Sequence, residues 1–275
     1  MNGFLTPKEI NECMVTSGKA KAALPIGKML FLGIFAGMYV GLGAYGFTIV
    51  TSGAGSGFEA TLAKFIGAGV FPVGLMLIIF CGAELFTGNC TLTLALAKKE
   101  ITIGSLVRNW TVVYLANFVG SVLLAWLLFK SGLYSGEAMA AKAIGIAEAK
   151  TAIPLLPIII RATFCNILVV LAVMMQAGSK DIIGKIFAIW FPIMLFVLAG
   201  FEHCVANMFF LPIGLFLGAD ITWSQIIMNN LIPVTIGNVI GGAFVVPGVY
   251  YYTYLRTNKE AISVASEPVM AATAE

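Results

Sequence analysis

The sequence predicts an all-α integral membrane protein with six transmembrane helices. These form two inverted three-helix repeats whose second and fifth helices are broken. The chain of 275 residues is 60% hydrophobic and 11% charged, with a mean hydropathy of +0.98, whereas soluble domains average about 25% charged residues. Apolar runs near the ~20 residues that a helix needs to cross a bilayer recur along the chain. Two of these runs are interrupted at matching places, which predicts the breaks and the repeat.

Charge and cysteine content exclude several other classes of protein. A formal net charge of +3 is too small to indicate nucleic-acid binding, and positive charge here sets the orientation in the membrane. Of the five cysteines, four lie inside apolar segments and none forms a CxxC pair. We therefore expect buried apolar cysteines, with neither a disulfide framework nor a metal site nor a cofactor. The polar stretch up to Lys28 predicts no cleavable signal peptide.

The N-terminal segment, residues 1–25, is predicted to form a cytoplasmic amphipathic helix. Thr6 can cap it, Pro7 suits the first helical position, and Glu9 completes a capping box. An apolar stripe favours a helix lying at the membrane surface. A regulatory lid over a pore mouth remains the alternative.

The first span is predicted over about 26–50. Gly33, Gly37 and Gly41 recur every fourth residue, so one helix face is nearly bare backbone and suits close packing in lipid. The GxGxxG pattern over 41–46 follows no strand, which excludes a dinucleotide site.

The remaining elements follow from the same reasoning about apolar runs and their polar interruptions. They are a second segment at about 63–97 interrupted at 82–91, a third span at about 110–129, an extramembrane loop at 130–151, a fourth span at about 153–175, a fifth from about 183 interrupted at 200–207, and a sixth at about 226–252. One channel domain thus covers 26–255, with repeat one about 26–130 and repeat two about 152–255, followed by a cytoplasmic C-terminal tail at 256–275.

The repeat is visible in the polar residues. Glu84 and Asn89 are five apart, as are Glu202 and Asn207. The spans that follow carry a second set with identical spacing: Asn109, Asn117 and Gly120 recur as Asn230, Asn238 and Gly241. Three spans per half means that the second half is inverted relative to the first. Broken helices in such repeats place the functional site near the midplane, where irregular backbone must line a cavity.

His203 is the only histidine in the chain and lies at the second break. An ionisable group at that depth indicates function more often than structure, because it donates to an anion or shuttles a proton. Glu84 and Glu202 are either proton-relay groups or, as their matched positions favour, carboxylates that cap free backbone N–H groups at the breaks.

Other residues near the breaks divide into polar and bulky apolar groups. Thr87 and Thr91 orient hydroxyls toward backbone or solute, and the asparagines Asn89, Asn207, Asn166 and Asn238 are expected to brace the breaks, some lining the pore. Leu85, Phe86, Phe196 and Phe201 are either packed bulk or apolar constrictions. A bare anion pays heavily to enter such a constriction, whereas a neutralised weak acid does not.

Three stretches resemble the formate–nitrite transporter family: 200–208 (GFEHCVANM), 230–242 (NLIPVTIGNVIGG) and 81–87 (CGAELFT). The resemblance covers essentially all spans. It implies an aquaporin-like protomer, assembled as a homopentamer with a pore in each protomer, in a family whose members carry formate, nitrite or hydrosulfide.

The resemblance also implies roles for individual residues. His203 would be the central pore histidine and Thr87 its partner. The constriction positions would be Leu85, Phe196, Phe71 and Leu75, with Asn166 and Asn238 near the pore. Lys150 would draw anions into the vestibule. Glu84 departs from the aspartate of formate channels, which leaves the fold unaffected and the substrate less certain.

We therefore expect a channel for small monovalent anions of weak acids, most of all formate, and no enzyme. The alternative is an aquaporin-like channel for neutral solutes, although no Asn-Pro-Ala triplet occurs. An ATP-driven pump is excluded because the segment 178–185 has the wrong spacing for a phosphate-binding loop. Eleven of the 16 Lys and Arg residues fall on the side of the two termini, which predicts that both termini are cytoplasmic.

Overall fold

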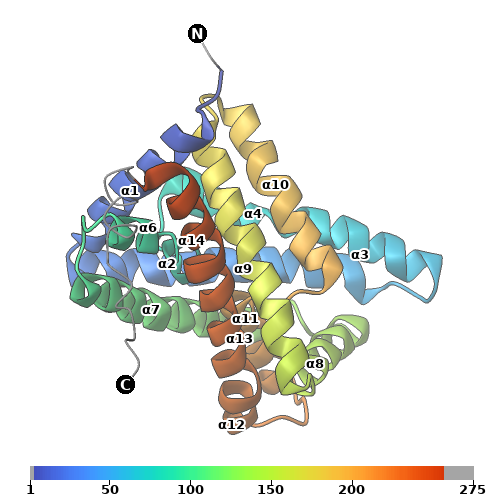
Figure 1. Ribbon diagram of the computed structural model, residues 1–275. Helices are drawn as coiled ribbons and strands as arrows, with labels where there is room; N and C mark the ends of the chain where they lie inside the picture. Colours follow the sequence, from blue (N-terminus) through green and yellow to red (C-terminus); the bar gives the residue numbers. More distant parts are fainter. Residues whose placement is uncertain (1–2, 257–275) are drawn as a thin grey trace, which may run out of the picture.

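The computed structural model describes residues 3–256, which are helical apart from short connections and one isolated bridge (Figure 1). The helices are α1 (Pro7–Ala22), α2 (Ile26–Ser52), α3 (Phe58–Val70), α4 (Val73–Cys81), α5 (Phe86–Asn89), α6 (Leu92–Ala97), α7 (Ile103–Lys130), α8 (Glu137–Thr151), α9 (Leu155–Gly178), α10 (Ile182–Ala199), α11 (Cys204–Phe216), α12 (Trp223–Gln225), η1 (Ile226–Leu231), α13 (Ile232–Val239), η2 (Ile240–Val245), α14 (Val246–Tyr250) and η3 (Tyr251–Leu255).

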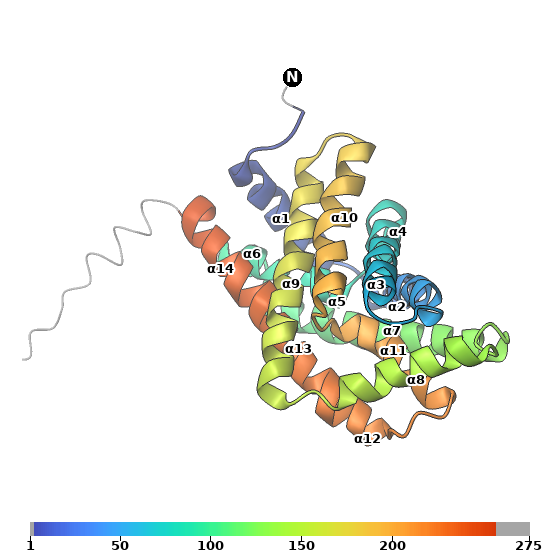
Figure 2. The same ribbon diagram turned by 90° about the vertical axis from the view of Figure 1, so that its right-hand side faces the viewer.

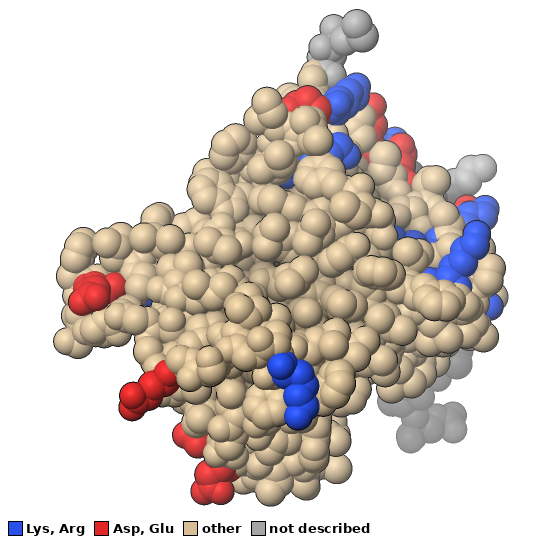
Figure 3. All heavy atoms as spheres, turned by 180° about the vertical axis from the view of Figure 1, so that it is seen from behind, with Lys and Arg blue, Asp and Glu red and all other residues tan. Residues whose placement is uncertain are grey.

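Six helical segments of the described chain are long and apolar enough to cross a membrane. They are Ile26–Ser52, Phe58–Cys81, Ile103–Lys130, Leu155–Gly178, Ile182–Ala199 and Trp223–Leu255. The six predicted spans are confirmed, although several extend further than their apolar runs. Many large apolar side chains on these helices stay exposed, as lipid-facing side chains do. Figure 3 shows a broad uncharged surface on one face, between charged side chains gathered toward its margins.

Both predicted breaks are present, and each begins at a glycine. α4 ends at Gly82, whose φ is 78°, and α10 ends at Gly200, whose φ is 76°. Only glycine adopts this left-handed region without strain. Three further residues follow each glycine before the next helix begins at Phe86 or at Cys204. The breaks therefore have the same length and lie 118 residues apart in the sequence.

The spans pack closely along glycine faces, as the four-residue spacing predicted. A Cβ added at Gly37 would collide with backbone atoms of Asn117, and one at Gly120 with the carbonyl of Ile34. In the second half, a Cβ at Gly241 would likewise collide with the carbonyl of Thr163. The first and third spans of each half therefore touch backbone to backbone.

The stretch expected to be an extramembrane loop contains a helix instead, α8. It buries Ala143 and Ala147 and packs along α11 (Figure 2). A Cβ at Gly214 of α11 would meet Ala147 directly. Alanine has the highest helix propensity, and its small side chain permits this close approach. The alanine-rich composition of 130–151 was therefore a helix signal.

The repeat extends beyond the three spans of each half, because α1 and α8 occupy equivalent places. The side-chain amide of Asn109 donates to the carbonyl of Lys21 at 3.2 Å, and that of Asn230 donates to the carbonyl of Lys150 at 2.9 Å. The two lysines lie 129 residues apart. Each half is therefore one short helix followed by three spans.

Several boundaries follow from local chemistry. Thr102 and Thr222 cap the third span of each half with matching capping boxes. Asp181 caps α10 by accepting from the N–H of Gly184 at 2.6 Å, and this hydrogen bond holds the pKa of the Asp181 carboxyl below its usual value. The second span is interrupted at Phe71 and Pro72, between α3 and α4, because proline lacks the N–H that a continuous helix requires. The expected tail beyond Arg256 lies outside the described residues.

Candidate functional site

His203 and Thr87 meet between the two breaks, as the resemblance predicted. His203 is the N-cap of α11 and is 4% exposed. Its Nδ1 accepts from the N–H of Ala206 at 3.1 Å, and its Nε2 lies 2.8 Å from Thr87 Oγ1. Because Nδ1 acts as an acceptor, we assign the proton of the neutral ring to Nε2. The N–H of this ring therefore points at the hydroxyl of Thr87, at the junction of the two halves.

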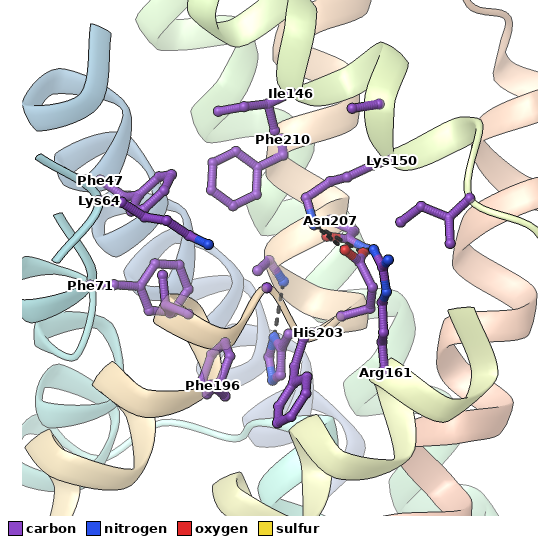
Figure 4. A pocket seen from close by; sticks show the side chains of 17 residues that line it. Phe47, Lys64, Phe71, Ile146, Lys150, Arg161, Phe196, His203, Asn207 and Phe210 are labelled. Carbon is purple, nitrogen blue, oxygen red and sulfur yellow. Dashed lines mark hydrogen bonds and ion pairs between the residues drawn. The ribbon is translucent and has the colours of Figure 1, made fainter. Parts of the chain in front are cut away.

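Two phenylalanines close the approach to His203 from one side. The rings of Phe71 and Phe196 meet edge to face with centroids 5.5 Å apart. Phe196 also stacks on the His203 ring, with a centroid distance of 5.8 Å and an interplanar angle of 22°. Figure 4 shows this apolar constriction at the base of a cavity, with His203 beside it.

Three cavities follow one another through the protein past this point. An outer cavity of about 360 Å³ and a central one of about 20 Å³ share Phe71, Phe196 and His203. An inner cavity of about 90 Å³ shares Leu75 and Leu85 with the central one. The four predicted constriction residues thus separate three spaces along one path. The central cavity has room for about one water molecule.

The central cavity is lined by pairs of residues from equivalent positions in the two halves. Val40 pairs with Val169, 129 residues further on, and Leu85 pairs with His203, 118 residues further on. Leu75 pairs with Ile193 in the same way. The chamber is therefore nearly symmetric and apolar, and His203 is the polar exception.

The break carboxylates form two matching networks. Glu84 accepts from Lys21 at 2.8 Å and from Asn89 at 2.7 Å. Glu202 accepts from Lys150 at 2.8 and 2.9 Å and from Asn207 at 2.7 Å. The amides of Asn89 and Asn207 also donate to Asn109 and Asn230, respectively. Each network ties a short surface helix to its break and to the following span.

The expected capping of backbone N–H groups by Glu84 and Glu202 is wrong. Asn117 Oδ1 accepts from the N–H of Phe86 at 2.9 Å, and Asn238 Oδ1 accepts from the N–H of Cys204 at 2.9 Å. The carboxylates bind the lysines instead, because a buried negative charge requires a cation more than a neutral donor.

Asn166 and Asn238 do not line the cavities described above. Asn238 is fully buried, and its amide donates to the carbonyls of Ala162 and Glu202 at 2.8 and 2.9 Å. Asn166 donates to the backbone carbonyl of Asn238 at 2.7 Å. All these contacts hold the break on the side away from the cavities. The expectation that Asn166 and Asn238 lie at the pore is therefore wrong for these cavities. Lys150 does line the outer cavity, although its ammonium is paired with Glu202.

Sequence reasoning missed four residues at this site. Asn117 was recognised only as a residue of the internal repeat, and Lys21 was counted only among the cations on the side of the two termini. Lys64 and Arg161 were counted for orientation, yet both line the outer cavity. The equivalence of Lys21 and Lys150 was detectable from their spacing only after α8 was known to be a helix.

The chain is similar to known transport proteins over nearly its full length. The model of the family described as "Formate/nitrite transporter" matches residues 8–252. A probable formate transporter of Methanothermobacter thermautotrophicus is 42% identical, covering 93% of this chain and 99% of the relative. The formate channel FocA of Escherichia coli strain K12 is 32% identical, covering 93% and 96%.

Solved structures agree with these relatives. A "pentameric formate channel with formate bound" superposes with a TM-score of 0.77 at 33% identity, covering 84% of this chain and 98% of that one. An "FNT family ion channel" superposes with a TM-score of 0.81 at 28% identity, covering 89% and 98%. Together with the six spans and the cavities between the broken helices, these likenesses establish that the chain is an integral membrane protein belonging to the formate/nitrite transporter family.

Proposed function

We propose that this protein is a channel for small monovalent anions of weak acids, with formate as the principal substrate and nitrite and hydrosulfide as further substrates. The observation that carries the proposal is the line of three cavities past His203, closed on each side by apolar side chains. The relatives named as formate transporters and channels support the choice of formate.

The geometry supports a mechanism in which charge is compensated at the centre. An unpaired charge in a dry constriction costs many kcal/mol. The Nε2–H of His203 and the hydroxyl of Thr87 are the polar groups that face each other at the centre of the path. A formate ion between the phenylalanine and leucine constrictions would receive a hydrogen bond there, or a proton that the imidazole has first taken up from water on one side of the path. Chloride, which takes up no proton under these conditions, would gain less.

The lysine–glutamate pairs beside the two breaks would hold the broken segments in place while the anion passes His203. Lys150 with Glu202 and Asn207, and Lys21 with Glu84 and Asn89, would fix the two broken segments relative to the surface helices. Lys150 also lines the outer cavity, but its pairing with Glu202 leaves little net charge there to draw anions inward in the way that the resemblance implied for this lysine. The side chain of Glu202 is 4% exposed, so Lys150 takes the place of water as the partner of its carboxylate.

The assembly and orientation belong to the same proposal. We infer a homopentamer embedded in the bilayer of the cytoplasmic membrane, with one path per protomer, because a structural neighbour is named as pentameric. Both termini would be cytoplasmic, because most Lys and Arg residues lie at that end. The protein would act by transport and not as an enzyme, as its relatives do by name.

The test is flux through purified protein in liposomes. Formate, nitrite and hydrosulfide influx should exceed that of empty liposomes, while glycerol and water permeability stay near background. Glycerol flux without anion flux would instead make the protein a neutral-solute channel. Loss of influx in a Thr87→Val variant, which keeps the shape of the side chain, would connect transport to the pair at the centre.

A further inference from the structure

The outer cavity contains two cationic side chains whose charge is not paired. Of its three cationic lining residues, Lys150 is bound to Glu202. Lys64 on α3 and Arg161 on α9 are both exposed, and among residues 3–256 no side-chain hydrogen bond or ion pair joins either of them to another residue.

Their place on spanning helices makes these free charges informative. A cation within a transmembrane segment is costly unless it faces water or a partner, and such residues mark solute pathways. Lys64 lies seven residues before the constriction residue Phe71, and Arg161 lies five residues before Asn166 of the break support. Both side chains line the outer cavity, which reaches His203, so an anion from solution is their available partner.

The two cations approach this cavity from different walls. Figure 4 shows Lys64 reaching in on the side of Phe71, while Arg161 stands on the opposite side, below Lys150. The phenylalanine constriction and His203 lie below them. An anion held between Lys64 and Arg161 would therefore be placed directly above the entrance to the central cavity.

The two groups recognise different features of an anion. A lysine ammonium is a compact point charge that attracts any anion, whereas the planar guanidinium of arginine offers parallel N–H groups that match two oxygens of one carboxylate. Formate and nitrite each present two oxygens in one plane. Hydrosulfide presents a single sulfur, which makes no use of the fork.

We propose that Lys64 and Arg161 form an anion-capture site in the outer cavity, in which Arg161 selects planar two-oxygen anions over single-centre anions such as hydrosulfide. This inference rests on the proposed function and adds to it a determinant of substrate class. Lys150 is not the capture group in this arrangement, because Glu202 already neutralises it at 2.8 Å.

The decisive comparison is between charge and shape at Arg161. Arg161→Lys keeps the charge and removes the fork, so it should raise the half-saturation concentration for formate about threefold, as for one lost charge-assisted pair at a partly hydrated site, and leave that for hydrosulfide unchanged. Arg161→Met and Lys64→Met remove a charge and should raise both. Uptake is measured in cells that express the protein, where its orientation is uniform.

Lys130 provides the matched control, because it ends α7 at the same end of the molecule and does not line the cavity. Lys130→Met should leave both half-saturation concentrations unchanged. If Arg161→Lys shifted formate and hydrosulfide equally, or neither, the proposed selection by shape would be wrong.

A second measurement does not depend on conduction. Saturation-transfer NMR on the formate proton, with purified protein in detergent, should show binding to the wild type and to Lys130→Met, and weaker binding to Arg161→Met and Arg161→Lys. Equal signals from all four proteins would overturn the capture site even if the channel conducts formate. Conversely, a binding signal that depends on Arg161 in a protein without formate flux would refute the proposed function and leave the site standing.

Discussion

One residue position distinguishes the two halves of the pore. His203 and Leu85 occupy equivalent places as the N-caps of α11 and α5, and both line the central cavity. In the second half the side chain at this position accepts a backbone N–H and reaches Thr87 across the junction of the halves. In the first half the same position offers only the methyl groups of Leu85. His203 is therefore the polar residue that lines the central cavity.

Replacing that imidazole should stop transport without unfolding the protein. We expect His203→Phe to reduce proton-dependent formate uptake to near the background of empty liposomes, because the ring fills the space and has no N–H to offer Thr87. The measurement is formate influx at several pH values, with the oligomer size checked by gel filtration. Wild-type rates and pH profile in a well-folded variant would refute the role of His203.

The charge of Lys150 should matter mainly through Glu202. Breaking a buried pair by removing one partner costs about 3–5 kcal/mol, since the other charge stays buried. We expect Lys150→Ala to raise the half-saturation concentration for formate, because the unpaired carboxylate of Glu202 then repels anions that enter the outer cavity. The effect should be larger at low ionic strength than at high, since salt screens this repulsion in the water-filled part of the path over a Debye length of about 8 Å.

The control for Lys150→Ala is the double variant Lys150→Ala with Glu202→Gln. The added substitution removes the unpaired carboxylate, so most of the wild-type half-saturation concentration and thermal stability should return. If the double variant were as impaired as the single one, Lys150 would act on the anion directly, and the account of a paired lysine would be incorrect.

At the scale of elements, each break is held by one asparagine on the third span of its half. Asn238 makes three hydrogen bonds that join α9, the break and the first N–H of α11. Asn117 makes the matching three contacts in the first half. Because both side chains are fully buried, each lost partner leaves an unsatisfied backbone group.

We expect Asn238→Ala and Asn117→Ala to lower stability equally, by roughly 3 kcal/mol for the three buried groups left unpaired. Both variants should also lower formate flux, because Asn238→Ala frees the start of α11 and misplaces His203, while Asn117→Ala frees the start of α5 and misplaces Thr87. Thermal denaturation in detergent and flux in liposomes measure the two effects. Wild-type flux in either folded variant would argue that its asparagine only stabilises the fold.

The elements that could be predicted from the sequence are those marked by a long apolar run or by a polar interruption of such a run. The six spans and both breaks follow from such runs, and the break asparagines followed from spacing. The partners of individual side chains could not be predicted from the sequence. Lys21, for example, reaches Glu84 from a helix more than 60 residues earlier in the chain. The helix α8 was read as a loop since its composition is too polar for a span. The interruption of the second span at Pro72 was not predicted, because a proline can also lie inside a continuous helix, as Pro192 does in α10.

At the scale of the whole molecule, apolar constrictions separate the three cavities of the path. The phenylalanine and leucine constrictions lie on either side of a chamber with room for about one water. We expect Leu85→Ala with Phe196→Ala to increase chloride conductance relative to formate flux, because the widened path admits water and lowers the cost of a bare ion. Bilayer recordings beside liposome flux give this ratio. An unchanged ratio in a folded, conducting double variant would mean that these side chains are not the selectivity barrier.

The correspondence between α1–α7 and α8–η3 also bears on ancestry. Two halves of opposite orientation that share the same capping boxes, lysine–glutamate pairs and glycine contacts imply a half-length ancestor able to insert either way round. Two such chains would have met as an antiparallel pair around a symmetric chamber, with identical residues at the positions of Leu85 and His203. Fusion of two such chains would have allowed each position to change independently of its counterpart. The imidazole is thus a mark of divergence, acquired or retained in one copy only.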